Sequence, residues 1–256
     1  MSWLGSRSAP AAVTWFGHAT VLLELGHTRL LTDPALCNRI GPLVRIAPAV
    51  PMGAIGRVDC VLLSHLHADH ADLRTLRKLA RSTPVLAPYP AARWLGRHGV
   101  RDVHELRAGE NFALGGSSVT ATPARHDRRR RPLGPGADPI GYVVRGSRTV
   151  YFAGDTDLFT QMAELGGDID LALLPVSGWG PTLPPGHLDP QRAARAAALI
   201  NPKVAIPIHW GTFALGRPAR RPADHGRPAR EFAALADRYA PSVRVLVLAP
   251  GERAEL

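Results

Sequence analysis

Three histidines and one aspartate stand within six residues of one another, directly after the apolar run Val58–Leu63. A short apolar run of this kind is typical of a buried strand, so the polar residues come where a strand gives way to a loop. His65 and His67 are two residues apart in an extended stretch and point the same way, whereas Asp69 and His70 follow the turn toward the next helix. Imidazole and carboxylate groups bind borderline and harder divalent cations. The segment therefore predicts the beginning of two adjacent metal sites.

Two metal ions need more ligands than this segment offers, so further ligands should follow other strands. Taken alone, a later histidine would be read as a surface residue. Together with the first segment, the later candidates indicate the rest of a metal centre. They stand at the ends of three strand-like runs: His126 after Ser118–Pro123, Asp155 after Thr149–Gly154, and His209 after Lys203–Ile208.

The order of these residues resembles that of a known family. His-x-His-x-Asp-His, a later His, Gly-Asp-Thr and a final His are the pattern of the metallo-β-lactamase superfamily. The resemblance extends from about Val13 to the C-terminus, and it implies an α/β fold: an αββα sandwich of two mixed sheets flanked by helices, with the metals at one edge between the sheets. Local phrases look like the branch that contains N-acylphosphatidylethanolamine phospholipase D and ascorbate-6-phosphate lactonase. These phrases are Trp15–Thr20, Leu31–Pro34, Phe152–Thr156, His187–Pro190 and Ile208–Phe213.

The resemblance also implies how the ligands are shared between two divalent metal ions. All seven positions of the pattern are filled, which argues against a metal-free relative. Because position 67 is His rather than Glu, zinc (Zn2+) is the favoured metal, and manganese (Mn2+) or iron (Fe2+) is compatible with the same ligands. A hydroxide bound to the metals would then act as the nucleophile. In this arrangement His65, His67 and His126 would hold the first metal, Asp69, His70 and His209 would hold the second, and Asp155 would bridge both.

The candidate catalytic residues are Asp69, Asp155 and His187. Asp155 would orient the hydroxide. His187 would donate a proton to the leaving group or bind the substrate, or it would be a plain loop histidine ahead of the helix that is expected to begin near Pro190.

Four further residues are candidates for supporting roles. Asp33 would lie against a ligand histidine and fix its tautomer, or it would only start a turn before Pro34. His18 is either a wall of the site or a turn residue. Trp179 and Trp210 are predicted to form apolar walls of the site.

The formal net charge of +10 suggests a polyanionic partner, but the chain is rich throughout in Ala, Gly, Pro and Arg, which looks like coding bias. One cluster stands out, because Arg125 and Arg128–Arg131 flank His126. Such a run is either a solvated loop face or a contact for an anionic substrate, with Arg125 and Arg128 as the candidate contacts.

The predicted substrate is therefore a small molecule, either a phosphodiester or another anionic compound. A lactonase or esterase of the same fold is the alternative. A nuclease or nucleic-acid-binding protein is the alternative from another class, and it is less favoured because the chain has no room for a large clamping insertion.

The remaining sequence predicts an N-terminal extension over residues 1–12 and a single hydrolase domain over residues 13–256. No apolar stretch is long enough for a transmembrane helix, and residues 1–12 lack the apolar core of a signal peptide, so a cytoplasmic location is expected. The two cysteines do not resemble a disulfide framework. Strands are expected to include Val13–Trp15 and Val243–Leu248. Helices are expected near Ala71–Ala80, Ala91–His98, Pro190–Ile200 and Ala229–Tyr239.

Overall fold

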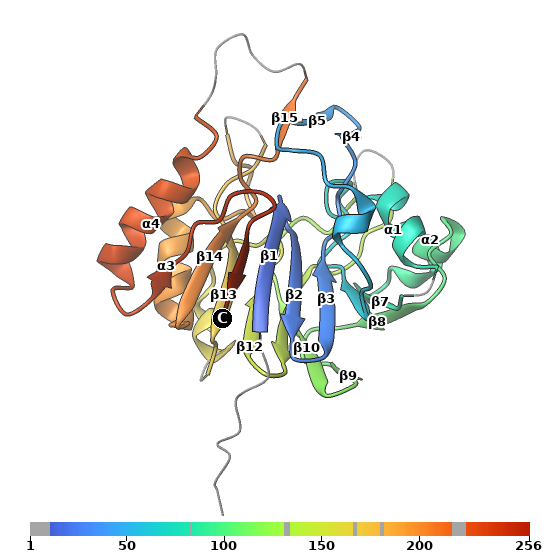
Figure 1. Ribbon diagram of the computed structural model, residues 1–256, viewed down its shortest axis with the longest axis horizontal. Helices are drawn as coiled ribbons and strands as arrows, with labels where there is room; N and C mark the ends of the chain where they lie inside the picture. Colours follow the sequence, from blue (N-terminus) through green and yellow to red (C-terminus); the bar gives the residue numbers. More distant parts are fainter. Residues whose placement is uncertain (1–10, 82, 131–133, 166–167, 180–181, 217–223) are drawn as a thin grey trace, which may run out of the picture.

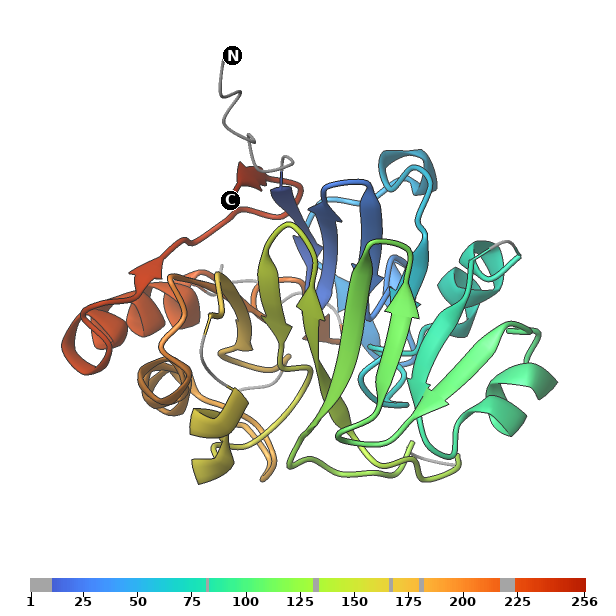
Figure 2. The same cartoon turned by 90° about the horizontal axis from the view of Figure 1, so that it is seen from below.

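Two large sheets lie face to face in the computed structural model, which describes residues 11–81, 83–130, 134–165, 168–179, 182–216 and 224–256 (Figures 1 and 2). The first sheet has the order β17 (Arg253–Glu255), β1 (Ala11–Gly17), β2 (Thr20–Leu25), β3 (Thr28–Thr32), β6 (Cys60–Leu62), β7 (Val85–Pro88) and β8 (Val103–Leu106). The second has the order β16 (Arg244–Val245), β14 (Val204–Ile208), β13 (Leu171–Pro175), β12 (Thr149–Phe152), β11 (Ile140–Arg145), β10 (Ser117–Pro123) and β9 (Asn111–Leu114). A small third sheet joins β15 (Phe213–Leu215), β5 (Leu43–Arg45) and β4 (Arg39–Ile40).

Both large sheets are mixed. In the first, β17, β1, β2 and β3 are antiparallel, and β3, β6, β7 and β8 run parallel. In the second, β9 to β12 are antiparallel, and β12, β13, β14 and β16 run parallel. The mixed sheets confirm the predicted arrangement. Parallel strands in one sheet end at the same edge, so residues that follow several of them are brought together.

Helices cover the outer face of each large sheet, as the two views show (Figures 1 and 2). Apolar side chains of α1 (Leu73–Leu79) and α2 (Ala92–Arg97) pack on the first sheet, and those of α3 (Pro190–Ile200) and α4 (Arg227–Tyr239) pack on the second. A third apolar cluster fills the space between the sheets and includes Trp15, Tyr142 and Phe152. Short 3-10 helices η1 (Met52–Ala54) and η2 (Thr160–Leu165) complete the elements. The four layers confirm the αββα sandwich.

Helix α3 illustrates why the sequence could locate some elements closely. Asp189 caps its first turn by accepting a hydrogen bond from the Arg192 backbone N–H at 2.7 Å, and Pro190 follows in the first helical turn. Asn201, in the left-handed conformation, ends it. Capping residues and a first-turn proline are strong helix-start signals, and the observed bounds are those predicted.

The bounds of some predicted strands differ from those observed. Strand β1 begins at Ala11, two residues before the predicted start at Val13, and it pairs with β2 and β17. The expected strand over Val243–Leu248 is reduced to Arg244–Val245, because the chain leaves β14 there and continues toward β17, which pairs with β1. Among the described residues, no helix combines the length and hydropathy needed to cross a membrane.

The predicted ligands all follow strands that end at one edge of the sandwich. The segment with His65 follows β6, His126 follows β10, Asp155 follows β12 and His209 follows β14. Residues that are far apart in the sequence therefore lie close together at one edge of the two sheets.

Candidate metal centre

The three histidines predicted for the first metal lie together. His65, His67 and His126 each offer one ring nitrogen, and these nitrogens all lie within 4.8 Å of one another. The rings are nearly perpendicular, with centroids 4.5 to 4.7 Å apart. His126 Nε2 and His67 Nδ1 are 3.0 Å apart. This set has the size of a site for one ion.

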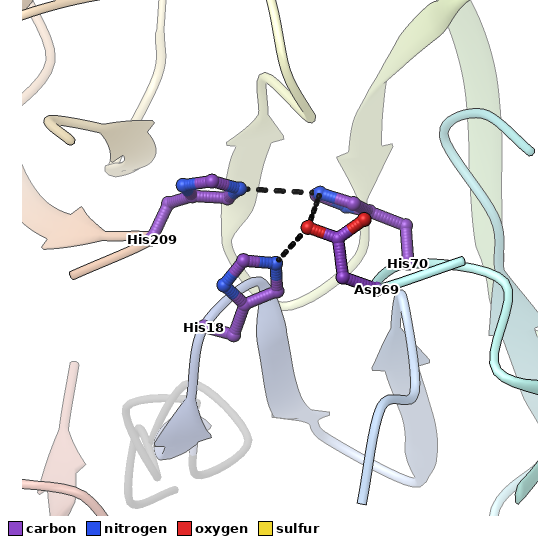
Figure 3. Close-up of side chains that lie close together, drawn as sticks. All are labelled: His18, Asp69, His70 and His209. Atoms are coloured by element: carbon purple, nitrogen blue, oxygen red, sulfur yellow. Dashed lines mark hydrogen bonds and ion pairs between the residues drawn. The ribbon is translucent and has the colours of Figure 1, made fainter. Parts of the chain in front are cut away.

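The residues predicted for the second metal form an adjoining set (Figure 3). His70 Nε2 lies 3.2 Å from His209 Nε2 and 3.9 Å from Asp69 Oδ2. His18 completes the group, with its ring 3.9 Å from that of His209 and its Nε2 3.1 Å from Asp69 Oδ2. All four residues are buried. Sequence reasoning left His18 open between a wall of the site and a turn residue, and it did not assign His18 to this group.

Asp155 lies between the two sets. Its Oδ2 is 3.3 Å from His70 Nε2, 3.3 Å from His209 Nε2 and 4.0 Å from His126 Nε2. The carboxylate therefore reaches nitrogens of both sets, which is the placement that a bridging ligand needs.

Each candidate ligand histidine is oriented by a partner at its other ring nitrogen. Such partners fix which nitrogen carries the proton and which faces the metal. Four of the five partners are acceptors by their chemistry, and the fifth is the Ser64 hydroxyl. The contacts are His67 Nε2 to the Arg129 carbonyl at 2.9 Å, His126 Nδ1 to the Gly186 carbonyl at 2.7 Å, His209 Nδ1 to the Ser177 carbonyl at 2.6 Å, His70 Nδ1 to Asp33 Oδ2 at 2.7 Å, and His65 Nδ1 to Ser64 Oγ at 2.9 Å.

The facing nitrogens of His67 and His126 fit a cation. Burial lowers the pKa of both rings, that of His126 to about 4, so both are neutral near pH 7. Each ring donates its proton to a backbone carbonyl, so both facing nitrogens present lone pairs. Lone pairs 3.0 Å apart repel each other, and a cation between them would turn that repulsion into coordination.

The second set fits a cation for an electrostatic reason. Burial opposes a proton on His70, but the charges of Asp155 and Asp33 raise its pKa well above the ordinary value. Burial likewise opposes a charge on Asp155, yet His209 and His70 hold its pKa well below the usual range. Buried carboxylates that remain negatively charged stabilise a proton on His70. The same negative charge would stabilise a bound metal ion.

Two buried polar atoms at the centre have no hydrogen-bond partner among the described residues. They are His65 Nε2 and Asp155 Oδ1. Buried polar atoms nearly always have partners, and a metal ion would supply one to each of these two candidate ligand atoms. The residues present therefore fit the metals that the sequence predicted.

Asp33 lies where a residue orienting the ligands should lie. It follows β3, is fully buried, and accepts hydrogen bonds from the Ser64 N–H at 2.7 Å and the Ser64 hydroxyl at 2.5 Å, in addition to that from His70. Because Ser64 gives its proton to Asp33, its oxygen is free to accept from His65. Asp33 thus orients one histidine directly and a second through Ser64, which sequence reasoning missed although Ser64 directly precedes His65.

His18 and Trp179 both contact Asp69. Burial and the neighbouring His209 lower the pKa of His18 to about 3, so its ring is neutral and donates to Asp69 Oδ2. The Trp179 indole N–H donates to the same oxygen at 3.0 Å. Two donors on one carboxylate oxygen fix the carboxylate's orientation.

Backbone strain marks the same region. Among the described residues, the non-glycine residues with positive φ are His18 (53°), Asp33 (30°), His209 (64°) and Asn201, which ends α3. Residues held in this conformation are uncommon and cluster at functional sites. Three of the four lie at the candidate centre, which supports a functional reason for their positions.

His187 lies beside the centre, with its Nε2 3.5 Å from Asp155 Oδ2 and its ring 4.6 Å from that of His126. Its Nδ1 donates to the Pro184 carbonyl at 3.0 Å. Burial opposes a proton on Nε2, but Asp155 raises the pKa of the ring. His126, Asp155 and His187 also lie close enough to share one ion. His187 is thus placed either to deliver a proton or to bind.

The arginine run divides into residues with different surroundings. Arg125 and His126 line a groove of about 370 Å³, and the Arg125 guanidinium lies 5.5 Å from the Phe159 ring centroid. Arg128 instead pairs with the exposed Asp138 at 3.0 Å. Arg131 lies outside the described residues. The groove makes Arg125 the better placed of the two candidate substrate contacts.

Trp210 is packed differently from Trp179. Its ring lies 4.7 Å from that of Trp15, and its indole N–H donates to the Pro207 carbonyl at 2.9 Å. These contacts join it to the apolar cluster between the sheets. Its predicted role as an apolar wall of the site gains no support from them.

Comparisons with known proteins give the family of this chain. A family model described as a β-lactamase superfamily domain matches residues 28–210. A UPF0173 metal-dependent hydrolase of Opitutus terrae is 35% identical, over 95% of this chain and 99% of the relative. An N-acyl-phosphatidylethanolamine-hydrolyzing phospholipase D of Caenorhabditis elegans is 30% identical, over 79% of this chain and 64% of the relative.

Among solved structures, Igni18, a metallo hydrolase of Ignicoccus hospitalis, has a TM-score of 0.75 at 23% identity and covers 97% of this chain and 99% of its own. That likeness supports the fold. The order of the candidate ligands along the chain, the αββα sandwich and the match to the family model agree, and the chain belongs to the metallo-β-lactamase superfamily.

Proposed function

We propose that this chain is a dinuclear metal-dependent hydrolase that acts on a phosphodiester or another small anionic substrate. The observation that carries the proposal is the position of Asp155, whose Oδ2 lies 3.3 Å from His70 Nε2 and 4.0 Å from His126 Nε2. One carboxylate within reach of both histidine sets is what a shared pair of ions requires. The relatives described as metal-dependent hydrolases support the reaction class.

The proposed ligands are His65, His67 and His126 for one ion and Asp69, His70 and His209 for the other, with Asp155 shared. Two such cations, when bound, would supply a hydroxide nucleophile near neutral pH and would polarise the bond to be cleaved. Zinc is proposed first because the set is rich in imidazole, and manganese or iron is compatible with it.

The protein's own residues would then organise the reaction. Asp33, Ser64 and the backbone carbonyls hold the ligand rings, and His18 and Trp179 hold the Asp69 carboxylate. His187 Nε2, 3.5 Å from Asp155, would hand a proton to the leaving group. A neutral leaving group departs more easily than an oxyanion, which is the reason to place an acid there.

Two ions per chain are the first expected result. Protein purified without chelator should contain about two equivalents of divalent metal, zinc foremost, because the ligands form two sets that share Asp155. Elemental analysis by inductively coupled plasma measures this directly. Saturation at one equivalent in folded protein would contradict the bridging role.

Arg125 in the groove beside His126 supports an anionic substrate, because a guanidinium can pair with two phosphate oxygens at once. The groove is also lined by Asp127 and Asp157, and Asp157 is paired with Arg192 at 3.0 Å. The Caenorhabditis elegans relative is named as a phospholipase D that hydrolyses N-acyl-phosphatidylethanolamine. A panel of chromogenic phosphodiesters, neutral esters and lactones, assayed with the metal-loaded protein, tests the class. Turnover of lactones or esters alone would establish the lactonase or esterase alternative.

Replacing Arg125 with Gln is expected to lower kcat/KM for an anionic phosphodiester at least about tenfold more than for a neutral ester of similar size, which is about 1.4 kcal/mol of transition-state binding. Arg145→Gln is the matched control. It removes the same charge from an exposed position far from the candidate site. Ile140, at the start of β11, pairs with Pro123 at the edge of the sheet that carries His126. Arg145, at the opposite end of β11, pairs with Ser118. Equal losses for the anionic substrate in both variants, with turnover of the neutral ester unchanged, would leave only general electrostatic steering. Equal small losses for both substrates in Arg125→Gln would remove Arg125 as an anion contact.

A further inference from the structure

The arginine run after His126 makes contacts that a role in substrate binding does not explain. Arg130 Nη1 donates to the Leu66 carbonyl at 2.6 Å and to the Ala71 carbonyl at 3.1 Å. These two carbonyls stand at the ends of residues 66–71, here called the ligand turn, which carries His67, Asp69 and His70. One guanidinium nitrogen has two protons, so it can serve both carbonyls at once.

The guanidinium of Arg130 is fixed in place from the other side. It lies 4.7 Å from the centroid of the Trp94 ring, a cation–π contact with α2. Its backbone N–H donates to the Pro135 carbonyl at 3.1 Å. A Cβ on Gly134 would lie 2.7 Å from the Arg130 Cβ, so only glycine leaves room there. Arg130 is therefore held at its backbone and at its side chain, and it is a poor candidate for a flexible substrate contact.

The residue before Arg130 acts on the same turn. The Arg129 carbonyl accepts the Nε2 proton of His67 at 2.9 Å, which leaves His67 Nδ1 to face His126 Nε2. Arg129 thus sets the tautomer of His67, and Arg130 holds both ends of the ligand turn that carries His67.

The ligand turn needs such support because its internal hydrogen bonds converge on one atom. The N–H groups of His70 and Ala71 both donate to the His67 carbonyl, at 3.1 and 2.8 Å. Leu66 and Ala71 are fully buried, so their carbonyls cannot turn to water, and an unpaired buried carbonyl is costly. Arg130 satisfies both.

We propose that Arg130 is a positioning residue that holds the ligand turn in the conformation in which His67, Asp69 and His70 meet their ions. The inference rests on the proposed metal centre for its functional meaning. It gives one member of the arginine run, Arg130, a role in supporting the centre and leaves Arg125 as the candidate for an anion.

The test compares four variants. Arg130→Ala removes both hydrogen bonds and the contact with Trp94. Arg130→Lys keeps the charge but offers a point donor in place of the fork. Trp94→Leu removes the cation–π contact and keeps the hydrogen bonds. Arg128→Ala removes one charge from the same segment, where the partner is the exposed Asp138.

Metal-free protein is titrated with cobalt(II) and followed by visible absorption, which reports ligand geometry as well as affinity. Arg130→Ala should bind cobalt about 10- to 100-fold more weakly than the wild type, with an altered spectrum, as expected when a partner of metal ligands is lost. Arg130→Lys should recover part of the loss. Arg128→Ala should keep wild-type affinity, and Trp94→Leu should lose less than Arg130→Ala, because the two hydrogen bonds remain. A folded Arg130→Ala variant with wild-type affinity and spectrum, or an equal loss in Arg128→Ala, would overturn the proposal.

Hydrogen exchange of the metal-free protein separates this inference from the proposed function. The amides of His70 and Ala71 should exchange faster in Arg130→Ala than in Arg128→Ala, because the turn opens more often without its anchor. Unchanged exchange would overturn the role of Arg130. A wild-type chain that takes up no cobalt would overturn the metal centre, and the exchange rates would still decide whether Arg130 holds the turn.

Discussion

Replacing Asp155 with Asn is expected to lower kcat/KM for any hydrolysed substrate by at least about a thousandfold, or about 4 kcal/mol of transition-state stabilisation. The amide keeps the volume of the side chain and removes its charge. Asp155 is the carboxylate within reach of both histidine sets, and its Oδ1 has no hydrogen-bond partner among the described residues. Metal content should fall together with activity, from about two equivalents toward one or fewer. Steady-state kinetics and elemental analysis of the same preparations measure both.

Two controls accompany this variant. Asp170→Asn removes a carboxylate that pairs with Lys203 at 2.8 Å, away from the candidate ligands, and should keep both metal and activity. Cys37→Ala should also keep activity, because no thiol is needed as the nucleophile. An Asp155→Asn variant that is folded, metal-replete and active would contradict the bridging role. An inactive, metal-replete Cys37→Ala variant would point to covalent catalysis instead.

The candidate ligands could be identified from the sequence because each of them comes shortly after an apolar run that is typical of a buried strand. A buried strand gives an apolar run, and the residue after its end is fixed in space by the sheet. His126, Asp155 and His209 each follow such a run, and the structure places them around the first segment.

The orientation of the ligand rings could not be read in the same way. It depends on the backbone carbonyls of Arg129, Ser177 and Gly186, and a carbonyl group is present in every residue type. Only the folded chain decides which carbonyl lies beside which ring. Asp33 was the exception, because its side chain carries the acceptor.

The arginine run shows a second limit. Sequence alone cannot distinguish an arginine side chain that faces solvent from one that is paired or buried, because the residue type is the same in both cases. In the structure Arg128 pairs with Asp138, and Arg130 reaches the carbonyls of Leu66 and Ala71. The short strands of the third sheet were missed for a related reason, since β4 and β5 are too short to show a period of two.

Replacing Asp33 with Asn should weaken metal binding about 10- to 100-fold, the range expected for a partner that orients a metal-binding histidine. Asp33 accepts three hydrogen bonds, two from Ser64 and one from His70. An amide has one acceptor and one donor group, so it cannot accept all three. If its NH₂ faces His70, the proton of that ring must move from Nδ1 to Nε2, the nitrogen that lies 3.2 Å from His209 Nε2. His70 would then carry its proton on Nε2, and that nitrogen could not bind a metal.

Ser64→Ala separates the two arms of this network. It removes the hydroxyl between Asp33 and His65 and leaves the bond to His70 intact, so it should affect binding of the first ion and spare the second. Cobalt titrations of the two variants should therefore differ, with one affinity lowered in Ser64→Ala and both lowered in Asp33→Asn. Thermal melting of the metal-free proteins shows how much of each loss is stability, since an unpaired buried donor costs about 1–3 kcal/mol. If the Asp33→Asn variant keeps metal affinity and activity at the wild-type level, Asp33 serves only the turn before Pro34, and the left-handed conformation of Asp33 has a purely structural cause.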